Sequence, residues 1–179
     1  MKKDFFKDST IKYPAYEPWI SNDDKQIVNK TLDQSMLTLG PQLEKFEANF
    51  CKYTESKFAV AVSNCTAALH LSLKALGIKE HDEVIIPDLT FVADASAILA
   101  CNAKPVIVDI NRNNFFLSIS NLKKNISKRT KAIIPVHTYG QVCNIDEILD
   151  VARDNNLKII EDCAHAVGTF HNSKHVGTV

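Results

Sequence analysis

The sequence has no long hydrophobic run and no excess of charge of either sign, and both absences exclude classes of protein. No segment is apolar over the roughly 20 residues that a membrane-spanning helix needs. Residues 1–8 mix charged and aromatic side chains and lack the apolar core of a secretion signal. Basic and acidic residues number 21 each, without a run of either sign that would bind nucleic acid or a membrane surface. We therefore expect a cytoplasmic protein that binds neither.

Paired cysteines and glycine-rich turns are also missing. The five cysteines are scattered and contain no C-x-x-C pair, which argues against a disulfide framework or a zinc knuckle. The five glycines form no G-x-G-x-x-G run, so a nicotinamide-binding Rossmann domain is disfavoured. His165, His171 and His175 are too loosely spaced for a metal site, and we expect no metal.

Hydrophobic residues make up 45% of the chain, enough for one core of ordinary size. From residue 58 onward, short apolar runs alternate with amphipathic stretches. The runs are rich in branched residues and lack alternating polarity, as expected for parallel strands covered on both faces. They lie at residues 58–62, 84–86, 105–108, 132–136 and 157–160. The sequence thus predicts an α/β fold of three layers, in which helices flank a mostly parallel sheet.

The amino-terminal residues differ from the rest. Residues 1–20 contain Pro14, Pro18 and Trp19 in an irregular order, which favours an arm over a regular element. From Ser21 onward apolar residues recur at helical spacing, and Ser21 to Asp24 can cap that helix. We therefore divide the chain into an arm, 1–20, and one domain, 21–179.

Polar residues directly after predicted strands are candidates for a site, because ligands bind at the carboxyl ends of parallel strands. Asp162 follows the last predicted strand, although a lone aspartate there more often caps a helix. Ser63 to Thr66 lead into a helix whose first amides could bind a phosphate group or could be an ordinary cap. Phe91 could stack on a flat ring or belong to the core, and His137 could be a base or a buried structural histidine.

A phosphate cradle, a stacking ring and an opposed carboxylate at successive strand ends describe a site for pyridoxal phosphate (PLP). An aspartate paired with the ring nitrogen keeps the pyridine protonated, so that the ring accepts electrons from a carbanion.

Five motifs together resemble the DegT/DnrJ/EryC1/StrS family of sugar-nucleotide aminotransferases, which are PLP enzymes of fold type I. They are LTLGPQLEKFE at 37–47, AVSNCTAALHLSL at 61–73, IIPDLTFVADASAIL at 85–99, KAIIPVHTYGQ at 131–141 and IIEDCAHAVG at 159–168. The resemblance implies the large PLP-binding domain of that fold, without its remaining strands and its small carboxyl-terminal domain.

The resemblance places the cofactor phosphate at Thr66 and at the amides of Cys65 and Ala67. Relatives commonly carry glycine where this chain has Cys65. Glycine lets the backbone approach a phosphate most closely, so the cysteine side chain is expected to shift or weaken binding but to be tolerated.

The resemblance also assigns residues to the cofactor ring. Phe91 and Ala164 would lie on its two faces, Asp162 would pair with the pyridine nitrogen, and His165 would reach the 3-hydroxyl. Asp162 and His165 are therefore the catalytic candidates within this chain.

Four further residues are weaker candidates for the substrate. Leu39 and Gly40 fall in a loop that lies near the active site in the family, and His137 and Tyr139 fall in a turn on the same side. The substrate implied is a nucleotide-linked keto-sugar of polysaccharide biosynthesis, with glutamate as the amino donor.

The family's Schiff-base lysine lies a short way beyond the EDxAH segment, and this chain ends at Val179 before reaching it. We therefore expect residues 1–179 alone to be inactive, and a homodimer for a complete enzyme. Two alternatives stay open: a PLP-dependent sugar dehydratase with histidine in place of the lysine, or a non-catalytic fragment.

Overall fold

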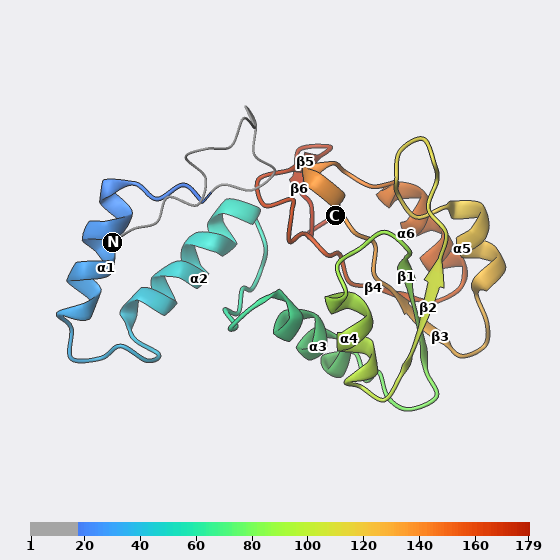
Figure 1. Cartoon of the computed structure of the whole chain (residues 1–179), viewed down its shortest axis with the longest axis horizontal. Coiled ribbons are helices and arrows are strands. Elements are labelled where there is room, and N and C mark those ends of the chain that lie inside the picture. The colour runs from blue at the N-terminus through green and yellow to red at the C-terminus, as the bar shows by residue number, and fades with distance from the viewer. Residues whose placement is uncertain (1–17) are drawn as a thin grey trace, which may run out of the picture. The chain divides into compact units, whose positions relative to one another are not determined.

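The computed structural model describes residues 18–179 in two compact units, which meet in sequence between Glu44 and Lys45 (Figure 1). Most of the predicted arm, residues 1–17, lies outside the described residues, and its last residues, 18–20, are exposed. The elements in order are α1 Asn22–Leu32, α2 Pro41–Thr54, α3 Cys65–Ala75, β1 Glu83–Pro87, α4 Ala93–Leu99, β2 Lys104–Val108, α5 Ile119–Asn125, β3 Thr130–Ile133, the 3-10 turn η1 Thr138–Gly140, α6 Ile145–Asp154, β4 Lys158–Ile159, β5 Phe170–His171 and β6 Lys174–His175.

The first unit contains α1 and the loop that follows it. A reciprocal capping box begins α1: the Asp24 amide donates to Ser21 Oγ at 3.1 Å, and the Ser21 amide donates to Asp24 Oδ2 at 2.7 Å. The predicted cap is thereby confirmed. Further along, Leu39 has a positive φ of 50°, and a Cβ on Gly40 would lie 2.7 Å from the Met36 carbonyl oxygen. Gly40 is therefore required by the backbone of this loop.

The second unit is built on a four-stranded sheet in the order β2-β1-β3-β4. All three strand pairs are parallel, with Ile85 of β1 opposite Val106 of β2 and Ile133 of β3. A separate antiparallel hairpin of β5 and β6 follows. The predicted parallel α/β sheet is confirmed.

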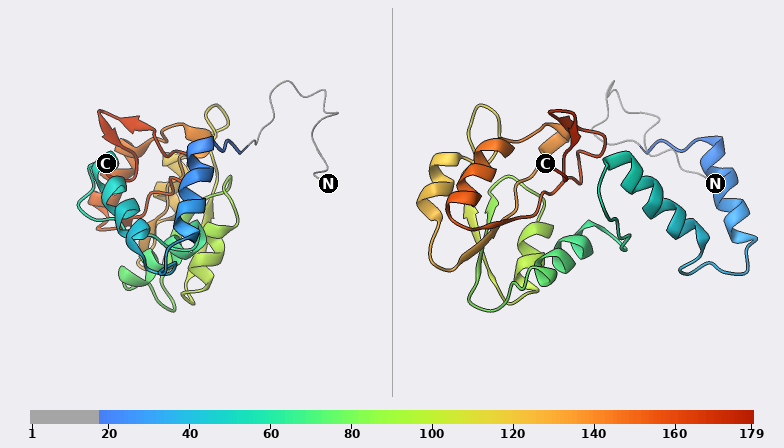
Figure 2. Two further views of the ribbon diagram at one scale, coloured as in Figure 1. Left: turned by 90° about the vertical axis from the view of Figure 1, so that its left-hand side faces the viewer. Right: turned by 180° about the vertical axis from the view of Figure 1, so that it is seen from behind.

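Helices cover both faces of this sheet, which completes the three predicted layers (Figures 1 and 2). Val84 and Ile86 pack with α3 and α4 on one face, whereas Ile85 between them packs with α5 and α6 on the other. All three are at most 2% exposed. Burial of each such side chain stabilises the fold by about 1.5–3 kcal/mol. Two-sided burial explains why these strands lack alternating polarity in the sequence.

The strand predicted at residues 58–62 is wrong for the described structure. These residues form no ladder, and the amide of Ala61 donates instead to Glu47 Oε1 at 2.8 Å. Phe58 and Val60 are 76% and 79% exposed. An apolar run becomes a strand only when a neighbouring strand accepts its hydrogen bonds, and no strand among residues 18–179 lies beside this one.

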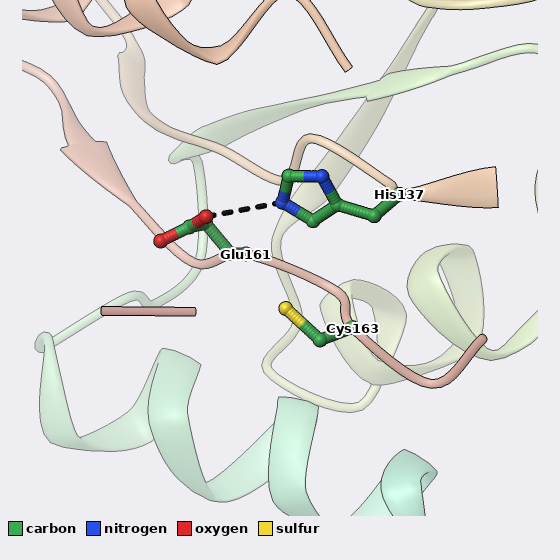
Figure 3. Close-up of side chains that lie close together, drawn as sticks. All are labelled: His137, Glu161 and Cys163. Carbon is green, nitrogen blue, oxygen red and sulfur yellow. Dashed lines mark hydrogen bonds and ion pairs between the residues drawn. The ribbon is translucent and has the colours of Figure 1, made fainter. Parts of the chain in front are cut away.

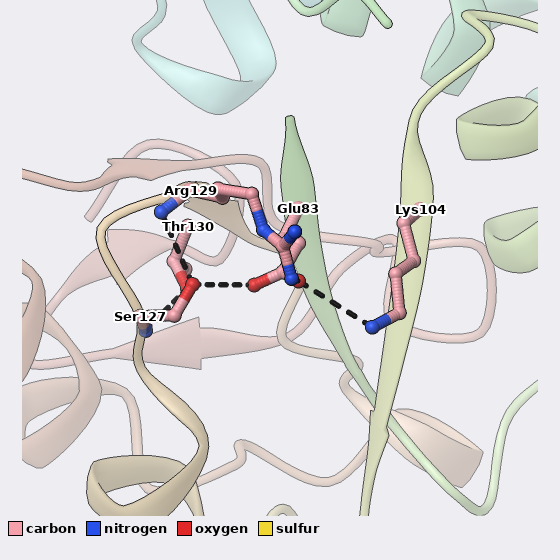
Figure 4. Close-up of polar contacts among 5 residues, drawn as sticks. All are labelled: Glu83, Lys104, Ser127, Arg129 and Thr130. Carbon is pink, nitrogen blue, oxygen red and sulfur yellow. Dashed lines mark hydrogen bonds and ion pairs between the residues drawn. The ribbon is translucent and has the colours of Figure 1, made fainter. Parts of the chain in front are cut away.

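A polar cluster holds the strands together at their amino ends (Figure 4). Glu83 of β1 is 4% exposed and accepts from Ser127 Oγ at 2.5 Å and from the Arg129 guanidinium at 2.7 Å. Lys104 of β2 lies 3.4 Å from the same carboxylate. The hydrogen bond from Ser127 is the largest cause that lowers the pKa of Glu83. This cluster ties β1 to β2 and to the turn before β3, and leaves the opposite sheet end to the candidate site.

Candidate active site

Backbone hydrogen bonds beyond the ends of β3 and β4 fix the position of Asp162. Val136 and Asp162 form an isolated parallel bridge. The Asp162 amide donates to the Pro135 carbonyl at 2.9 Å, and the His137 amide donates to the Asp162 carbonyl at 3.1 Å. The Asp162 side chain therefore starts from a rigid strand end, where the parallel sheet presents residues to ligands.

The Asp162 carboxylate is 6% exposed and has no basic partner among the described residues. Its Oδ1 accepts from the Ala164 amide at 2.8 Å and from the Cys65 thiol at 3.8 Å. A carboxylate that is nearly buried and lacks a counter-charge favours a cationic ligand group beside it.

Asp162 lines a pocket of about 240 Å³. Phe91, Ala164 and His165 line it together with Asp162, and Thr138 and Tyr139 belong to its wall. Phe91 is 71% exposed and so has a free ring face. The structure thus brings the four predicted ring contacts around one cavity.

The amino end of α3 lies next to Asp162, because α3 begins at Cys65 and the Cys65 thiol contacts Asp162 Oδ1. Asn64 caps the helix, and its Oδ1 accepts from the Ala67 amide at 2.9 Å. Among residues 18–179 the amides of Cys65 and Thr66 and the Thr66 hydroxyl have no hydrogen-bond partner. The structure confirms an N-cap at Asn64. The phosphate-binding interpretation stays a prediction, because free amides at the start of an 11-residue helix can bind an anion.

His165 is held in place by Tyr139. The two rings stack with centroids 5.7 Å apart at 17°, and the Tyr139 amide donates to His165 Nδ1 at 3.4 Å. This bond makes Nδ1 an acceptor, so the neutral imidazole carries its proton on Nε2. Tyr139 adopts a positive φ of 55°, which is uncommon for a residue other than glycine, and is 77% exposed.

The His137 side chain points toward Glu161 (Figure 3), and His137 is not among the residues that line the pocket. It is 0% exposed; its Nδ1 accepts from the Cys143 amide at 3.2 Å, and its Nε2 lies 3.0 Å from Glu161 Oε2. The Gly177 amide also donates to that carboxylate at 3.0 Å. The geometry favours the alternative of a buried structural histidine over a substrate contact.

His137, Glu161 and Cys163 place possible metal-binding atoms within 4.8 Å of one another. A metal on His137 Nε2 would require the proton on Nδ1, where the Cys143 N–H already points. Burial raises the pKa of the Cys163 thiol, and the Glu161 and Asp162 charges raise it further. The hydrogen bonding of this group is therefore that of a neutral histidine donating to a carboxylate.

Leu39 and Gly40, the other substrate candidates, belong to the first unit and are described only within it. Asp94, in contrast, lies at the site but was missed. It is 0% exposed in α4 and accepts a hydrogen bond from Thr90, which lines the same pocket as Asp162. The available signal was one acidic residue in the otherwise small and apolar run V-A-D-A-S-A-I-L at 92–99.

Comparison with known proteins assigns the chain to a family. The sequence profile of the DegT/DnrJ/EryC1/StrS aminotransferase family matches residues 18–179. The chain belongs to this family. The resemblance seen in the motifs is thereby confirmed.

Three similar proteins give the extent of the match. The GDP-perosamine synthase of Escherichia coli O157:H7 is 42% identical over 170 residues, which cover 94% of this chain and 47% of the relative. DesV of S. venezuelae superposes with a TM-score of 0.84 at 37% identity, over 87% of this chain and 42% of DesV. NtdA of Bacillus subtilis, solved with bound cofactor PMP, superposes with a TM-score of 0.78 at 35% identity, over 83% of this chain and 35% of NtdA. This family member therefore spans less than half the length of each.

The residues of this family member fit a bound PLP group. A buried carboxylate without a basic partner meets the need of a cationic ring nitrogen, and an aromatic ring lines the same pocket. The amides of Cys65 and Thr66, at the amino end of α3, have no partner among residues 18–179 and would bind a phosphate group. No helix among residues 18–179 is long and apolar enough to cross a membrane.

Proposed function

We propose that this protein is a PLP-dependent aminotransferase that moves an amino group from glutamate to a nucleotide-linked keto-sugar, in the synthesis of a surface polysaccharide. The observation that carries the proposal is Asp162, which is nearly buried and lines the same pocket as Phe91, Ala164 and His165. The family match and the name GDP-perosamine synthase of a relative support the reaction class and the type of substrate.

In this proposal Asp162 binds the protonated ring nitrogen, and the bound ring supplies an electron sink for the amino-group carbon. The Ala164 amide keeps Asp162 Oδ1 in place. Phe91 and Ala164, which line the pocket, would contact the ring, and His165 Nε2 would donate to the 3-hydroxyl, while the Tyr139 amide donates to His165 Nδ1.

The phosphate would bind at the start of α3. The Cys65 and Thr66 amides and the Thr66 hydroxyl donate to it, and the positive end of the helix dipole favours its charge. The Ala67 amide reaches the phosphate only if it leaves Asn64, so it is the weakest of the predicted contacts. Tyr139 remains a candidate substrate contact because its exposed ring lines the pocket entrance.

The test uses the full-length gene product with PLP, glutamate and a panel of nucleotide-linked keto-sugars. We expect bound-cofactor absorbance and release of 2-oxoglutarate together with an aminated nucleotide sugar. Asp162→Ala should reduce turnover by at least about 100-fold, because a positioned charge partner of this kind contributes several kcal/mol.

Other outcomes would replace the proposal. Loss of water from the sugar without amino transfer would favour the dehydratase alternative. Absence of both cofactor binding and turnover in the full-length protein would favour a non-catalytic role.

We further propose a cytoplasmic homodimer, since the family builds its active sites across two subunits. Light scattering of the active full-length protein is expected to give twice the monomer mass. An active monomer would contradict this part of the proposal.

A further inference from the structure

Asp94 is an acidic residue that the proposed reaction does not yet use. It is 0% exposed in α4, and Thr90 Oγ1 donates a short hydrogen bond to its Oδ2. Its Oδ1 is buried without a hydrogen-bond partner in the described part of the chain. A buried, unpartnered carboxylate oxygen is costly to the fold, so it calls for a partner or a proton.

The nearest candidate partner is another carboxyl group. Thr90, which donates to Asp94, lines the same pocket as Asp162, and the Cys65 thiol lies 3.8 Å from Asp162 Oδ1. The charge of Asp162 acts on Asp94, and it raises the pKa of that group. The side chains that contact this pair of carboxyl groups are Thr90, before α4, and Cys65, on α3, and neither carries a positive charge. Two adjacent buried carboxylates do not readily both ionise.

A proton shared by Asp94 and Asp162 would resolve both the lack of a partner for Asp94 Oδ1 and the repulsion between two carboxylates. A protonated Asp94 would donate from Oδ1 to the Asp162 carboxylate, and one of the two negative charges would be absent. Thr90 can still donate to Oδ2, since that oxygen remains an acceptor.

We propose that Asp94 is a positioning residue that shares one proton with Asp162, and that loss of this proton strengthens Asp162 as the partner of the cofactor ring nitrogen. The second half of this proposal rests on the proposed function. The first half concerns only two side chains of this chain.

The direction of the pH dependence follows from the environment. Burial, followed by the charge and the contact of Asp162, raises the pKa of Asp94 to about 6, against the lowering effect of Thr90. Below that pH the pair carries one negative charge, and above it two. A cationic ring nitrogen is attracted more strongly by two charges, so cofactor affinity should fall as the pH drops through this range.

The first experiment follows the side-chain carboxyl carbons of the cofactor-free full-length protein by NMR between pH 3 and pH 8. We expect Asp94 to titrate near pH 6 and to shift downward in Asp162→Asn, which removes the second charge. Thr90→Val should shift the midpoint upward, because the hydroxyl that favours the charged form is lost. Titration of Asp94 at its ordinary value, unchanged by Asp162→Asn, would overturn the shared proton.

The second experiment measures the dissociation constant of PLP at pH 5.0 and 7.5 in the wild type and in Asp94→Asn. Asparagine can keep the Thr90 bond and donate to Asp162, so it imitates the protonated form at every pH. The increase in dissociation constant on acidification should be about fivefold larger in the wild type than in the variant. Asp154→Asn, an exposed site on α6, is the matched control and should behave as the wild type.

The two parts of the proposal fail separately. Equal pH dependence of wild type and Asp94→Asn would overturn the link to the cofactor even if the carboxyl titration supports the pair. Failure of the wild type to bind PLP at any pH would instead contradict the proposed function, and the carboxyl titration would still decide whether the proton is shared.

Discussion

At the scale of single residues, the structure gives the side chain of Cys65, at the start of α3, a defined position. The thiol points to Asp162 Oδ1, 3.8 Å away, although the residue as a whole is exposed. Burial of the sulfur, followed by the charges of Asp162 and Asp94, raises its pKa to about 11. Cys65 is therefore a weak thiol donor to the site and not a nucleophile.

Cys65 should consequently react slowly despite its exposure. At pH 8 its thiolate population is expected to be about 100-fold lower than that of an ordinary thiol of pKa 9, so alkylation by iodoacetamide should slow by a similar factor. Mass spectrometry of timed samples, with free N-acetylcysteine as the comparison, measures this rate. Asp162→Asn should accelerate labelling of Cys65, and equal rates for wild-type Cys65 and the free thiol would contradict the assignment.

At the scale of elements, the sheet is fixed at one end by hydrogen bonds around Glu83 and leaves its other end to the site. Because the pKa of Glu83 is lowered, first by the Ser127 hydroxyl, its contribution to stability is present above the unfolded value of 4.5 and is lost as the pH falls through the folded value. The charged partners Arg129 and Lys104 are mostly exposed, so the hydroxyl matters more than they do.

Ser127→Ala tests this end of the sheet. We expect the free energy of unfolding to fall by about 1–2 kcal/mol at pH 7, because a buried carboxylate loses a charge-assisted hydrogen bond. The loss should shrink as the pH falls below the unfolded value of 4.5 and Glu83 becomes protonated in the folded state as well. Urea unfolding at pH 7 and at acidic pH measures it, with Ser96→Ala at an exposed position of α4 as the control. A loss that is independent of pH would contradict the role of the carboxylate.

The sequence predicted correctly those elements whose burial or capping determines the residue types at their own positions. Val84 to Ile86 form a continuous branched run because helices cover both sheet faces, and the Asn64 turn is readable because caps act locally. Residues 58–62 carry the same apolar signal but form no strand, since pairing depends on a neighbour that the local sequence does not specify.

The site was predictable in part for the same reason. Asp162 follows a strand, and position alone brings it to the ligand-binding end of the sheet. Asp94 lies inside a helix, where an acidic residue is usually on the solvent face, and only the packing of α4 buries it beside Thr90, a residue of the pocket. The enclosure of His137 likewise depends on Cys143 and Glu161, which lie 6 and 24 residues away.

At the scale of the molecule, the second unit exposes a large apolar surface. Residues 58–62, Phe46 and Phe50 line a hollow of about 520 Å³, with Val60 79% exposed. Surfaces of this kind normally contact further protein. The GDP-perosamine synthase and DesV chains that match this sequence are each more than twice its length.

This surface should make the 179-residue chain self-associate. We expect Val60→Asp to lower the associated fraction in sedimentation velocity, because a charge inside an apolar contact is poorly solvated. Asn113→Asp adds the same charge in an exposed loop and should leave association unchanged. An equal effect of both variants would indicate that net charge, and not the hollow, controls association.

The central claim, that Asp162 pairs with a protonated cofactor ring, is tested most directly by the ¹⁵N chemical shift of the ring nitrogen in PLP bound to the full-length protein. We predict the shift of a protonated pyridine in the wild type at pH 7.5, and a shift toward unprotonated pyridine in Asp162→Asn with PLP still bound. An unprotonated ring in the wild type, or the same shift in both proteins, would contradict the account.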